Sequence, residues 1–409
     1  MTLLNQDAIV AVAQDTLSQR FGGNQLLSDV TQLSGSGSAM VLRARVAPSP
    51  FLQQRSVILK YSPQSGDTLN DAALIREIVA YQFTTSLSES VRPGPVLLAH
   101  DVDQRIIVLS DSGDGDTFAD LLQTDDAERR VHILRNLGTA LGRMHAGTAE
   151  HEQDFDILFT RMMRNHSGSQ EIQQLRSTAF SQAIQVGEEL LRSAGFEIPD
   201  LVSEYSTEAR NRLQMARHRA FSPFDLSPDN IIVANKTHFL DYEWAGFRDV
   251  SFDLACVIAG FPQFIFSHPI TDDEADVFVD SWVHEVSALW PNFTNEENLY
   301  KRIAGALLGW ALSSVALMHF GSLSEAMHTL HEEGDDFDPT QVTSDTRLLR
   351  PADHGPFTRD EIIFRRDMFE TFEALSRYAA RGADPSFGVI ALFAKEIADR
   401  LAEPRLQAY

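Results

Sequence analysis

Three oxygen-bearing side chains near the middle of the sequence have the types and the spacing needed to handle phosphate groups. Asp225 is followed five residues later by Asn230, and Asp241 comes after a short apolar stretch. Phosphoryl transfer needs a carboxylate that orients the attacking hydroxyl, and oxygen ligands that hold magnesium on the phosphates. The pattern therefore predicts Asp225 as the group that orients the hydroxyl, with Asn230 and Asp241 as magnesium ligands.

A β-hairpin is expected to position these three side chains. The apolar run 231–233 and the pair Phe239-Leu240 read as two short strands, and Asn235-Lys236 supplies a turn between them. A surface hairpin with incidental acidic residues fits the same pattern. The choice between the two readings depends on what precedes the hairpin in the chain.

An upstream strand and helix supply a lysine and a glutamate in the order that a nucleotide site requires. Residues 57–61 form a β-type run that carries Lys60 among apolar residues, and residues 74–81 have helical periodicity and present Glu77. An ion pair between the two would hold the lysine against the nucleotide phosphates. An ordinary strand lysine and a solvated glutamate are the alternative.

Two flexible segments are further candidates for nucleotide contacts. The Gly/Ser run 33–38 contains Ser36 and Gly37, and such a loop can offer backbone N–H groups to phosphate oxygens. A second polar connector contains Ser110 and Ser112 after an apolar strand, where backbone groups could meet an adenine edge. Gly/Ser clusters are also ordinary turns, so both assignments depend on the fold.

Taken in order, these segments resemble the aminoglycoside phosphotransferase and choline kinase superfamily, the small-molecule branch of the protein-kinase-like fold. Members of that superfamily carry H-G-D-x-x-x-x-N, then a strand that ends in I-D-W-E or a close relative, then D-L-A. The corresponding segments here are 223–230 (PFDLSPDN), 240–246 (LDYEWAG) and 252–255 (FDLA).

The resemblance implies an α+β, bilobal protein-kinase-like fold with a small antiparallel-sheet lobe at residues 1–111 and a mainly helical lobe at residues 112–409. It implies ATP and Mg²⁺ as cofactors and a hydroxyl of a small molecule as the phosphate acceptor. Lys60 would contact the nucleotide phosphates and Glu77 would hold it. Asp253 would be structural, accepting backbone hydrogen bonds that fix the catalytic loop.

One departure from the superfamily pattern lies next to the catalytic aspartate. Pro223-Phe224 stands where members have histidine-glycine. Proline lacks a backbone N–H and fixes φ, so the loop must be held differently, and the Phe224 ring must find a pocket or cover the site. An active small-molecule kinase and a catalytically degenerate pseudokinase that binds nucleotide or ligand in a regulatory role both remain open.

The amino-acid composition limits which classes of molecule the protein is expected to bind. The chain of 409 residues has 34 Lys and Arg against 58 Asp and Glu, a net charge of −24. That charge argues against nucleic acid as a partner, and it would attract a cationic acceptor. A single cysteine, Cys256, lies in an apolar run and fits a reducing, cytoplasmic setting. The N-terminal residues show no secretory signal pattern.

The remaining sequence is expected to be largely helical. Residues 276–289 and 362–379 are amphipathic, and 303–320 reads as a buried helix of the large lobe rather than a membrane span, because glycine, serine and histidine interrupt it. The polar segment 150–220 is expected to be a helical insertion. Residues 331–360, rich in Asp, Thr, Pro and Gly, suggest a long mobile insertion.

Overall fold

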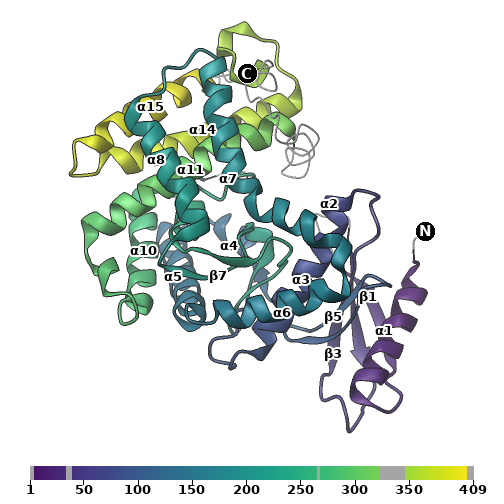
Figure 1. Cartoon of the computed structure of the whole chain (residues 1–409). Helices are drawn as coiled ribbons and strands as arrows, with labels where there is room; N and C mark the ends of the chain where they lie inside the picture. The colour runs from purple at the N-terminus through teal and green to yellow at the C-terminus, as the bar shows by residue number, and fades with distance from the viewer. Residues whose placement is uncertain (1–3, 34–38, 265–267, 322–345, 403–409) are drawn as a thin grey trace.

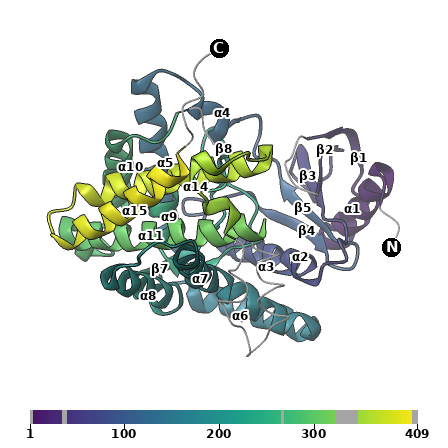
Figure 2. The same cartoon turned by 90° about the horizontal axis from the view of Figure 1, so that it is seen from above.

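The computed structural model of the chain describes residues 4–33, 39–264, 268–321 and 346–402. An antiparallel sheet and one helix lie at one end of the molecule, and helices make up most of the other end (Figures 1 and 2). This arrangement confirms the predicted α+β fold with a small sheet before a large helical part. The sheet ends with the strand that stops at Ser110, and the boundary predicted at residue 111 directly follows it.

The main sheet has five strands in the order β1-β2-β3-β5-β4, and every neighbouring pair is antiparallel. Two smaller sheets, β10-β7 and β6-β8-β9, belong to the helical part. The strands are β1 Leu27–Gln32, β2 Met40–Val46, β3 Ser56–Tyr61, β4 Leu97–Asp101, β5 Ile106–Ser110, β6 Asp116–Thr117, β7 Arg219–Ser222, β8 Ile231–Val233, β9 Thr237–Phe239 and β10 Gly246–Asp249.

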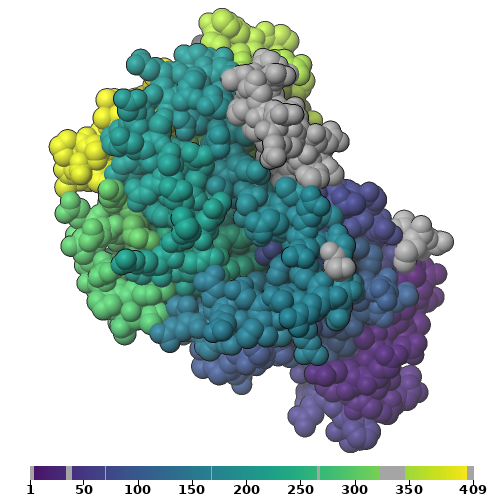
Figure 3. Space-filling model, viewed as in Figure 1, coloured from purple at the N-terminus to yellow at the C-terminus, as the bar shows by residue number. Residues whose placement is uncertain are grey.

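Helices account for most of the remaining described residues. They are α1 Gln6–Phe21, α2 Thr68–Asp71, α3 Ala73–Ser86, α4 Phe118–Leu122, α5 Ala127–Thr148, α6 Glu152–Asn165, α7 Gln170–Ser193, α8 Asp200–Met215, α9 Ser251–Ile258, α10 Asp272–Val286, α11 Glu296–Phe320, α14 Arg359–Ala380 and α15 Ser386–Leu401. The insertion predicted at 150–220 is helical, since α6, α7 and α8 fill most of it. Its teal residues form the middle of the face seen in Figure 3.

Strand alternation explains which face of β3 meets the functional site. Val57, Leu59 and Tyr61 are buried in a core that also contains Ile9 and Ala13 of α1. Because side chains alternate across a strand, Lys60 projects from the opposite face, away from α1. The helix α1 therefore covers one side of the sheet and leaves the other side to the site.

The long apolar helix α11 is part of the core. Of the helices in the described ranges, α11 alone is long and apolar enough to cross a membrane, and 89% of its most apolar window is buried. Burial inside the protein therefore accounts for its hydropathy, as the sequence predicted. The helices expected at 276–289 and 362–379 correspond to α10 and α14.

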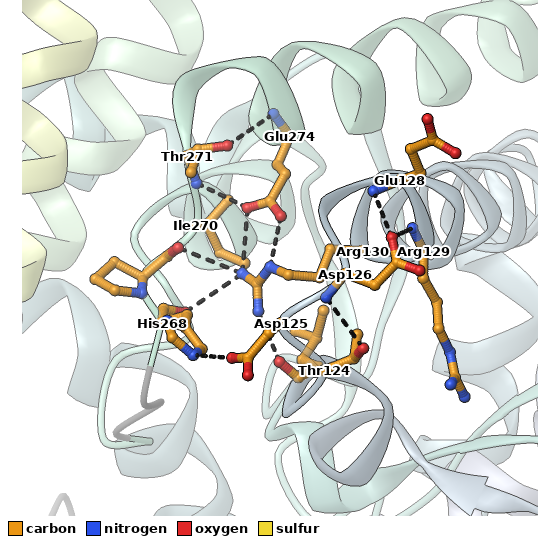
Figure 4. A network of polar contacts seen from close by, with 12 residues as sticks. Thr124, Asp125, Asp126, Glu128, Arg129, Arg130, His268, Ile270, Thr271 and Glu274 are labelled. Atoms are coloured by element: carbon orange, nitrogen blue, oxygen red, sulfur yellow. Dashed lines mark hydrogen bonds and ion pairs between the residues drawn. The ribbon is translucent and has the colours of Figure 1, made fainter.

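A buried ion pair joins the start of α5 to the start of α10 (Figure 4). Arg130 Nε lies 2.6 Å from Glu274 Oε1, and Glu274 Oε2 also accepts a bond from the backbone N–H of Thr271 in a capping box. Helix N-termini favour such carboxylates because their first N–H groups lack helical partners. The pair thus fixes how α10 packs along α5.

The acidic insertion predicted at 331–360 is only partly described. Residues 331–345 lie outside the described ranges. The described remainder contains two short 3-10 helices, Arg347–Leu349 and Ala352–His354, and Arg350 Nη1 forms an ion pair with Glu361 Oε1 at 3.0 Å. The end of this segment is therefore fastened to the start of α14.

Candidate active site

Lys60 joins the sheet to α3 and to the segment after β9. Its Nζ lies 2.7 Å from Glu77 Oε1 and 2.9 Å from Asp241 Oδ1. Glu77 is fully buried on α3, whereas the Asp241 side chain is 34% exposed. The structure therefore brings together the predicted Lys60–Glu77 pair, and it adds Asp241 as a second partner of the same ammonium.

Charge in this cluster is unevenly balanced. Burial alone would lower the pKa of Lys60, but the carboxylates of Glu77 and Asp241 outweigh it and raise that pKa. Burial raises the pKa of Glu77 to about 7, although the Lys60 ammonium opposes the shift. Burial also raises the pKa of Asp225 and of Glu243, and Asp241 adds to both shifts. The Lys60 ammonium, and the Arg176 guanidinium that acts on Glu243, thus face four carboxylates, an excess of negative charge that suits an added cation.

The hairpin β8–β9 holds the two predicted metal ligands together. Ile231 pairs with Phe239, and beyond that pair the backbone N–H of Leu240 donates to the carbonyl of Asn230 at 2.8 Å. Asp241 follows directly, with φ +57, a left-handed conformation that aspartate tolerates better than most residues. The short loop from Asp225 to the hairpin is closed by Asn230 Nδ2, which donates to Asp225 Oδ2 at 3.3 Å. The three predicted residues therefore share one site.

These oxygen donors fit magnesium. Asn230 uses its amide nitrogen on Asp225, which leaves its Oδ1 available, and Asp241 uses one carboxylate oxygen on Lys60. No group of three or more His, Cys, Asp or Glu side chains in the described ranges could hold a metal ion by itself. Magnesium is commonly bound by one or two protein oxygens together with substrate phosphates and water, so a pair of side-chain oxygens suffices.

Asp253 braces the strand that leads into the loop carrying Asp225. It accepts hydrogen bonds from Ser222 Oγ at 2.7 Å and from His145 Nε2 at 2.9 Å. The indole of Trp282 donates to His145 Nδ1 at 2.9 Å, so the proton of His145 sits on Nε2. Asp253 is structural, as expected, but its partners are side chains rather than the backbone N–H groups that the resemblance implied.

Phe224 is fixed by rings and a guanidinium. It has φ +66, and its ring stacks on Trp310 with centroids 5.5 Å apart and meets the edge of Phe180 at 4.7 Å. The Arg248 guanidinium lies over the ring, 4.1 Å from its centroid. The ring is therefore packed beside Asp225 as part of a wall.

That wall belongs to a cavity of about 380 Å³ beside Asp225. Its lining combines the carboxylates Asp225 and Glu243 with six aromatic side chains: Phe180, Phe224, Trp244, Phe261, Phe264 and Trp310. Small-molecule sites are typically concave and mostly apolar with a few placed polar groups. Cys256 also contributes to the lining and is buried, as predicted.

The other four residues predicted to contact the nucleotide are Ser110, Ser112, Ser36 and Gly37. Ser110 Oγ accepts a hydrogen bond from the backbone N–H of Val96 at 2.8 Å, and Ser112 Oγ lies 2.6 Å from His238 Nδ1. Both hydroxyl groups therefore have protein partners, and their role toward a nucleotide stays a prediction. Ser36 and Gly37 lie outside the described residues.

Sequence reasoning singled out Phe224 but not the lining residues that come from α7, from α11 and from the segment after α9. Phe180 comes from α7 and Trp310 from α11, while Phe261 and Gln263 follow α9 with φ +58 and +74. Tyr81 was missed too: its hydroxyl accepts a bond from the backbone N–H of Asp241 at 3.3 Å. Aromatic residues on helices read as core, and no spacing rule distinguishes those that line a cavity.

Solved structures that are similar to this chain include two choline kinases. The one named LicA from Streptococcus pneumoniae is 14% identical over 82% of this chain and 95% of its own, with a TM-score of 0.42. The one from Cryptosporidium parvum Iowa II is 11% identical over 84% of this chain and 95% of its own, also with a TM-score of 0.42. The streptomycin–ATP–APH(2″)-IIa ternary complex is 13% identical over 81% of this chain and 99% of its own, with a TM-score of 0.44.

A comparison with curated proteins finds no match. The family comparison does: one model matches residues 53–291, more than half of the chain, and the matched range contains Lys60, Glu77, Asp225 and Asp241. On that match, the chain belongs to the phosphotransferase enzyme family.

Proposed function

We propose that this protein transfers the γ-phosphoryl group of ATP, with magnesium, to a hydroxyl of a small molecule. The observation that carries the proposal is the position of Asp225. Its carboxylate lines the aromatic cavity on one side and accepts from Asn230, the predicted metal ligand, on the other. An acceptor in the cavity would therefore meet the same carboxylate that borders the metal site.

Each residue has a defined task in this reaction. Asp225 orients the acceptor hydroxyl and takes up its proton, and burial raises the pKa of Asp225, which makes it a better base than a solvated aspartate. Lys60, held by Glu77, contacts the phosphates. Asn230 and Asp241 would hold magnesium, which when bound neutralises charge on the phosphate oxygens.

The volume and lining of the cavity limit the size and charge of the acceptor. Its volume of about 380 Å³ lies at the small end of the usual range for ligand sites, about 300–1,000 Å³, so a small metabolite or antibiotic fragment fits. A cationic acceptor stays part of the proposal, since Asp225 and Glu243 face the cavity and the chain carries a net charge of −24.

The first test is nucleotide binding, because it needs no knowledge of the acceptor. ATP at about a hundred times its dissociation constant should stabilise the protein by about 2.7 kcal/mol, which raises the melting temperature measurably. We expect a magnesium-dependent rise in the wild type that Asp241→Asn loses.

Turnover is tested with Asp225→Asn. This variant should bind magnesium-ATP but release no ADP with any acceptor that the wild type phosphorylates. Asp229→Asn is the matched control, because Asp229 is an exposed acid on the same loop. Undiminished activity of Asp225→Asn would refute the assignment. Clear nucleotide binding with no ADP release across hydroxyl acceptors would instead favour the regulatory pseudokinase.

A further inference from the structure

Three consecutive carbonyls shortly after Asp241 are each bound by an arginine: Arg76 and Arg176 are buried, and Arg248 is half-buried. The carbonyl of Glu243 accepts from Arg176 Nη2 at 2.8 Å, and that of Trp244 from Arg248 Nη1 at 2.6 Å. The carbonyl of Ala245 accepts from Arg76 Nη1 at 3.1 Å. Residues 243–245 lie in neither a helix nor a strand, so the guanidinium groups supply bonds that regular structure does not.

This cluster is an expensive one to bury. Within the described ranges, Arg76, Arg176 and Arg248 form no ion pair with a carboxylate. Burial lowers the pKa of Arg76 to about 9 and of the other two to about 10, so all three stay charged at neutral pH. Removing charge from water is costly, and the charges of Arg248 and Arg176 further lower the pKa of Arg76. Glu243 and Asp67 partly offset the burial of Arg176, and Asp253 partly offsets that of Arg248. Their main-chain bonds are therefore strong constraints on the segment.

Two of these arginines, Arg76 and Arg176, also tie α2 and α3 to α7. Arg76 Nε donates to Gln173 Oε1 at 3.0 Å, and Gln173 Nε2 donates to the carbonyl of Ala72 at 2.7 Å. Arg176 Nη1 donates to the carbonyl of Leu69 at 3.0 Å. A closed set of buried hydrogen bonds thus links α2 and α3 to α7, where each polar partner would cost free energy if it were left alone.

Apolar contacts anchor the other end of α3 in the large helical part. The Phe83 ring lies 5.7 Å from Phe155 of α6, 5.4 Å from Phe221 of β7 and 5.6 Å from Phe247 of β10. The buried apolar residues of α3 belong to the core of the helical part, whereas those of β3 belong to the core shared with α1. The helix that carries Glu77 is therefore fixed to the same body as Asp241.

We propose that Arg76 is a positioning residue for the metal site of the phosphoryl-transfer reaction, a role that rests on the proposed function. Arg76 and Glu77 are neighbours on α3: Glu77 reaches Asp241 through Lys60, and Arg76 binds the carbonyl of Ala245, four residues after Asp241. The helix thus holds the metal-ligand segment at both ends. Where a kinase controls the position of its glutamate-bearing helix, activity follows that position. Here α7 holds the helix in place.

The test compares Arg76→Met and Arg76→Lys in the full chain, with a non-hydrolysable ATP analogue as the probe. Calorimetric titration measures its affinity with magnesium and with EDTA. Loss of a group that orients metal ligands typically weakens metal binding by about 10–100-fold. We expect Arg76→Met to lose about tenfold or more of the magnesium-dependent affinity while its affinity in EDTA stays near that of the wild type. Arg76→Lys keeps the charge and one donating nitrogen in place of three, so it should recover part of the loss.

Arg365→Met is the matched control. Arg365 lies on α14, is equally buried, and donates to the carbonyls of Leu348, Arg350, Arg400 and Leu401. It should lower the melting temperature but leave the magnesium response intact.

A magnesium response in Arg76→Met equal to that of the wild type would overturn the positioning role but not the proposed function. If Arg76→Met fails to fold, a wild-type magnesium response in Arg76→Lys would likewise overturn the positioning role. Absence of magnesium-dependent binding in the wild type itself would overturn the proposed function, and the positioning role with it.

Discussion

Removing the Lys60 ammonium should destabilise the fold as well as the site. Lys60→Met replaces the shared cation of Glu77 and Asp241 with an apolar side chain of similar length. Breaking a buried ion pair by removing one partner costs about 3–5 kcal/mol. We expect the lower end of that range at neutral pH, because Glu77 can take up a proton and Asp241 reaches solvent.

The double variant Lys60→Met/Glu77→Gln separates stability from function. Glutamine keeps the shape of Glu77 without its charge, and replacing both members of a buried pair by neutral groups is often neutral or stabilising. The free energy of unfolding of the double variant should therefore lie within about 1 kcal/mol of the wild-type value. It should still fail to bind magnesium-ATP, because no cation remains to contact the phosphates.

The stability lost in Lys60→Met should grow as pH rises. In Lys60→Met, the folded-state pKa of Glu77 rises further above its unfolded value, since the ammonium that opposed the shift is gone. The folded state then holds an extra proton over the window between those two pKa values, so its stability falls as pH rises through that window. The deficit relative to the wild type should be larger at pH 8 than at pH 5.5, and the double variant should lose this dependence.

Urea unfolding at both pH values, extrapolated to water, measures these differences. Lys236→Met is the matched control, because Lys236 makes a 3.3 Å pair with Glu89 in which both side chains are exposed, and such pairs contribute about 0–1 kcal/mol. A deficit below about 1 kcal/mol for Lys60→Met at pH 8, or a double variant no more stable than the single one, would refute the buried-charge argument.

The stability contributions of two other buried carboxylates, Asp367 and Asp249, should change with pH in opposite directions. Burial raises the pKa of Asp367 to about 7, although the N–H of Gln263 donates to it, so the folded protein holds an extra proton between about pH 4 and 7. Asp367→Asn should therefore stabilise the protein at pH 8 by up to about 4 kcal/mol, measured by urea unfolding. An unchanged stability at pH 8 would contradict this. Asp249 is buried, and the ion pairs with Arg212 and Arg302 lower its pKa against the effect of burial. Its stability contribution is present above the unfolded pKa and is lost as pH falls through the lower folded value, so Asp249→Asn should cost about 3–5 kcal/mol at pH 7, and the difference from the wild type should shrink below about pH 4.

Local geometry explains why the sequence could place the candidate site residues near one another. Asp225 and Asn230 lie on one short loop, and Asp241 lies just past the hairpin whose register pairs Ile231 with Phe239. Spacing along the chain therefore fixes their positions in space. Lys60 and Glu77 were predictable for a related reason, because strand alternation and helical periodicity each determine the face that carries the charged group.

The cavity and the arginine cluster depend on contacts that no spacing rule encodes. Phe180 and Trp310 meet at the Phe224 ring only because α7 packs against α11. Arg76 reads in the sequence as an ordinary helical arginine, and its partners lie 97 and 169 positions away along the chain. Such contacts follow from tertiary packing, which propensity and periodicity do not specify.

The departure at Pro223-Phe224 is compensated within the loop. Proline offers no N–H, but Ser222 Oγ accepts from the N–H of Phe224 at 2.9 Å and donates to Asp253, so one hydroxyl links the loop to α9. The left-handed backbone of Phe224 costs about 1–2 kcal/mol. A buried phenylalanine side chain contributes about 1.5–3 kcal/mol, and its contacts with Trp310 and Arg248 add to that. Burial therefore offsets the backbone cost, and the same ring forms the cavity wall next to Asp225.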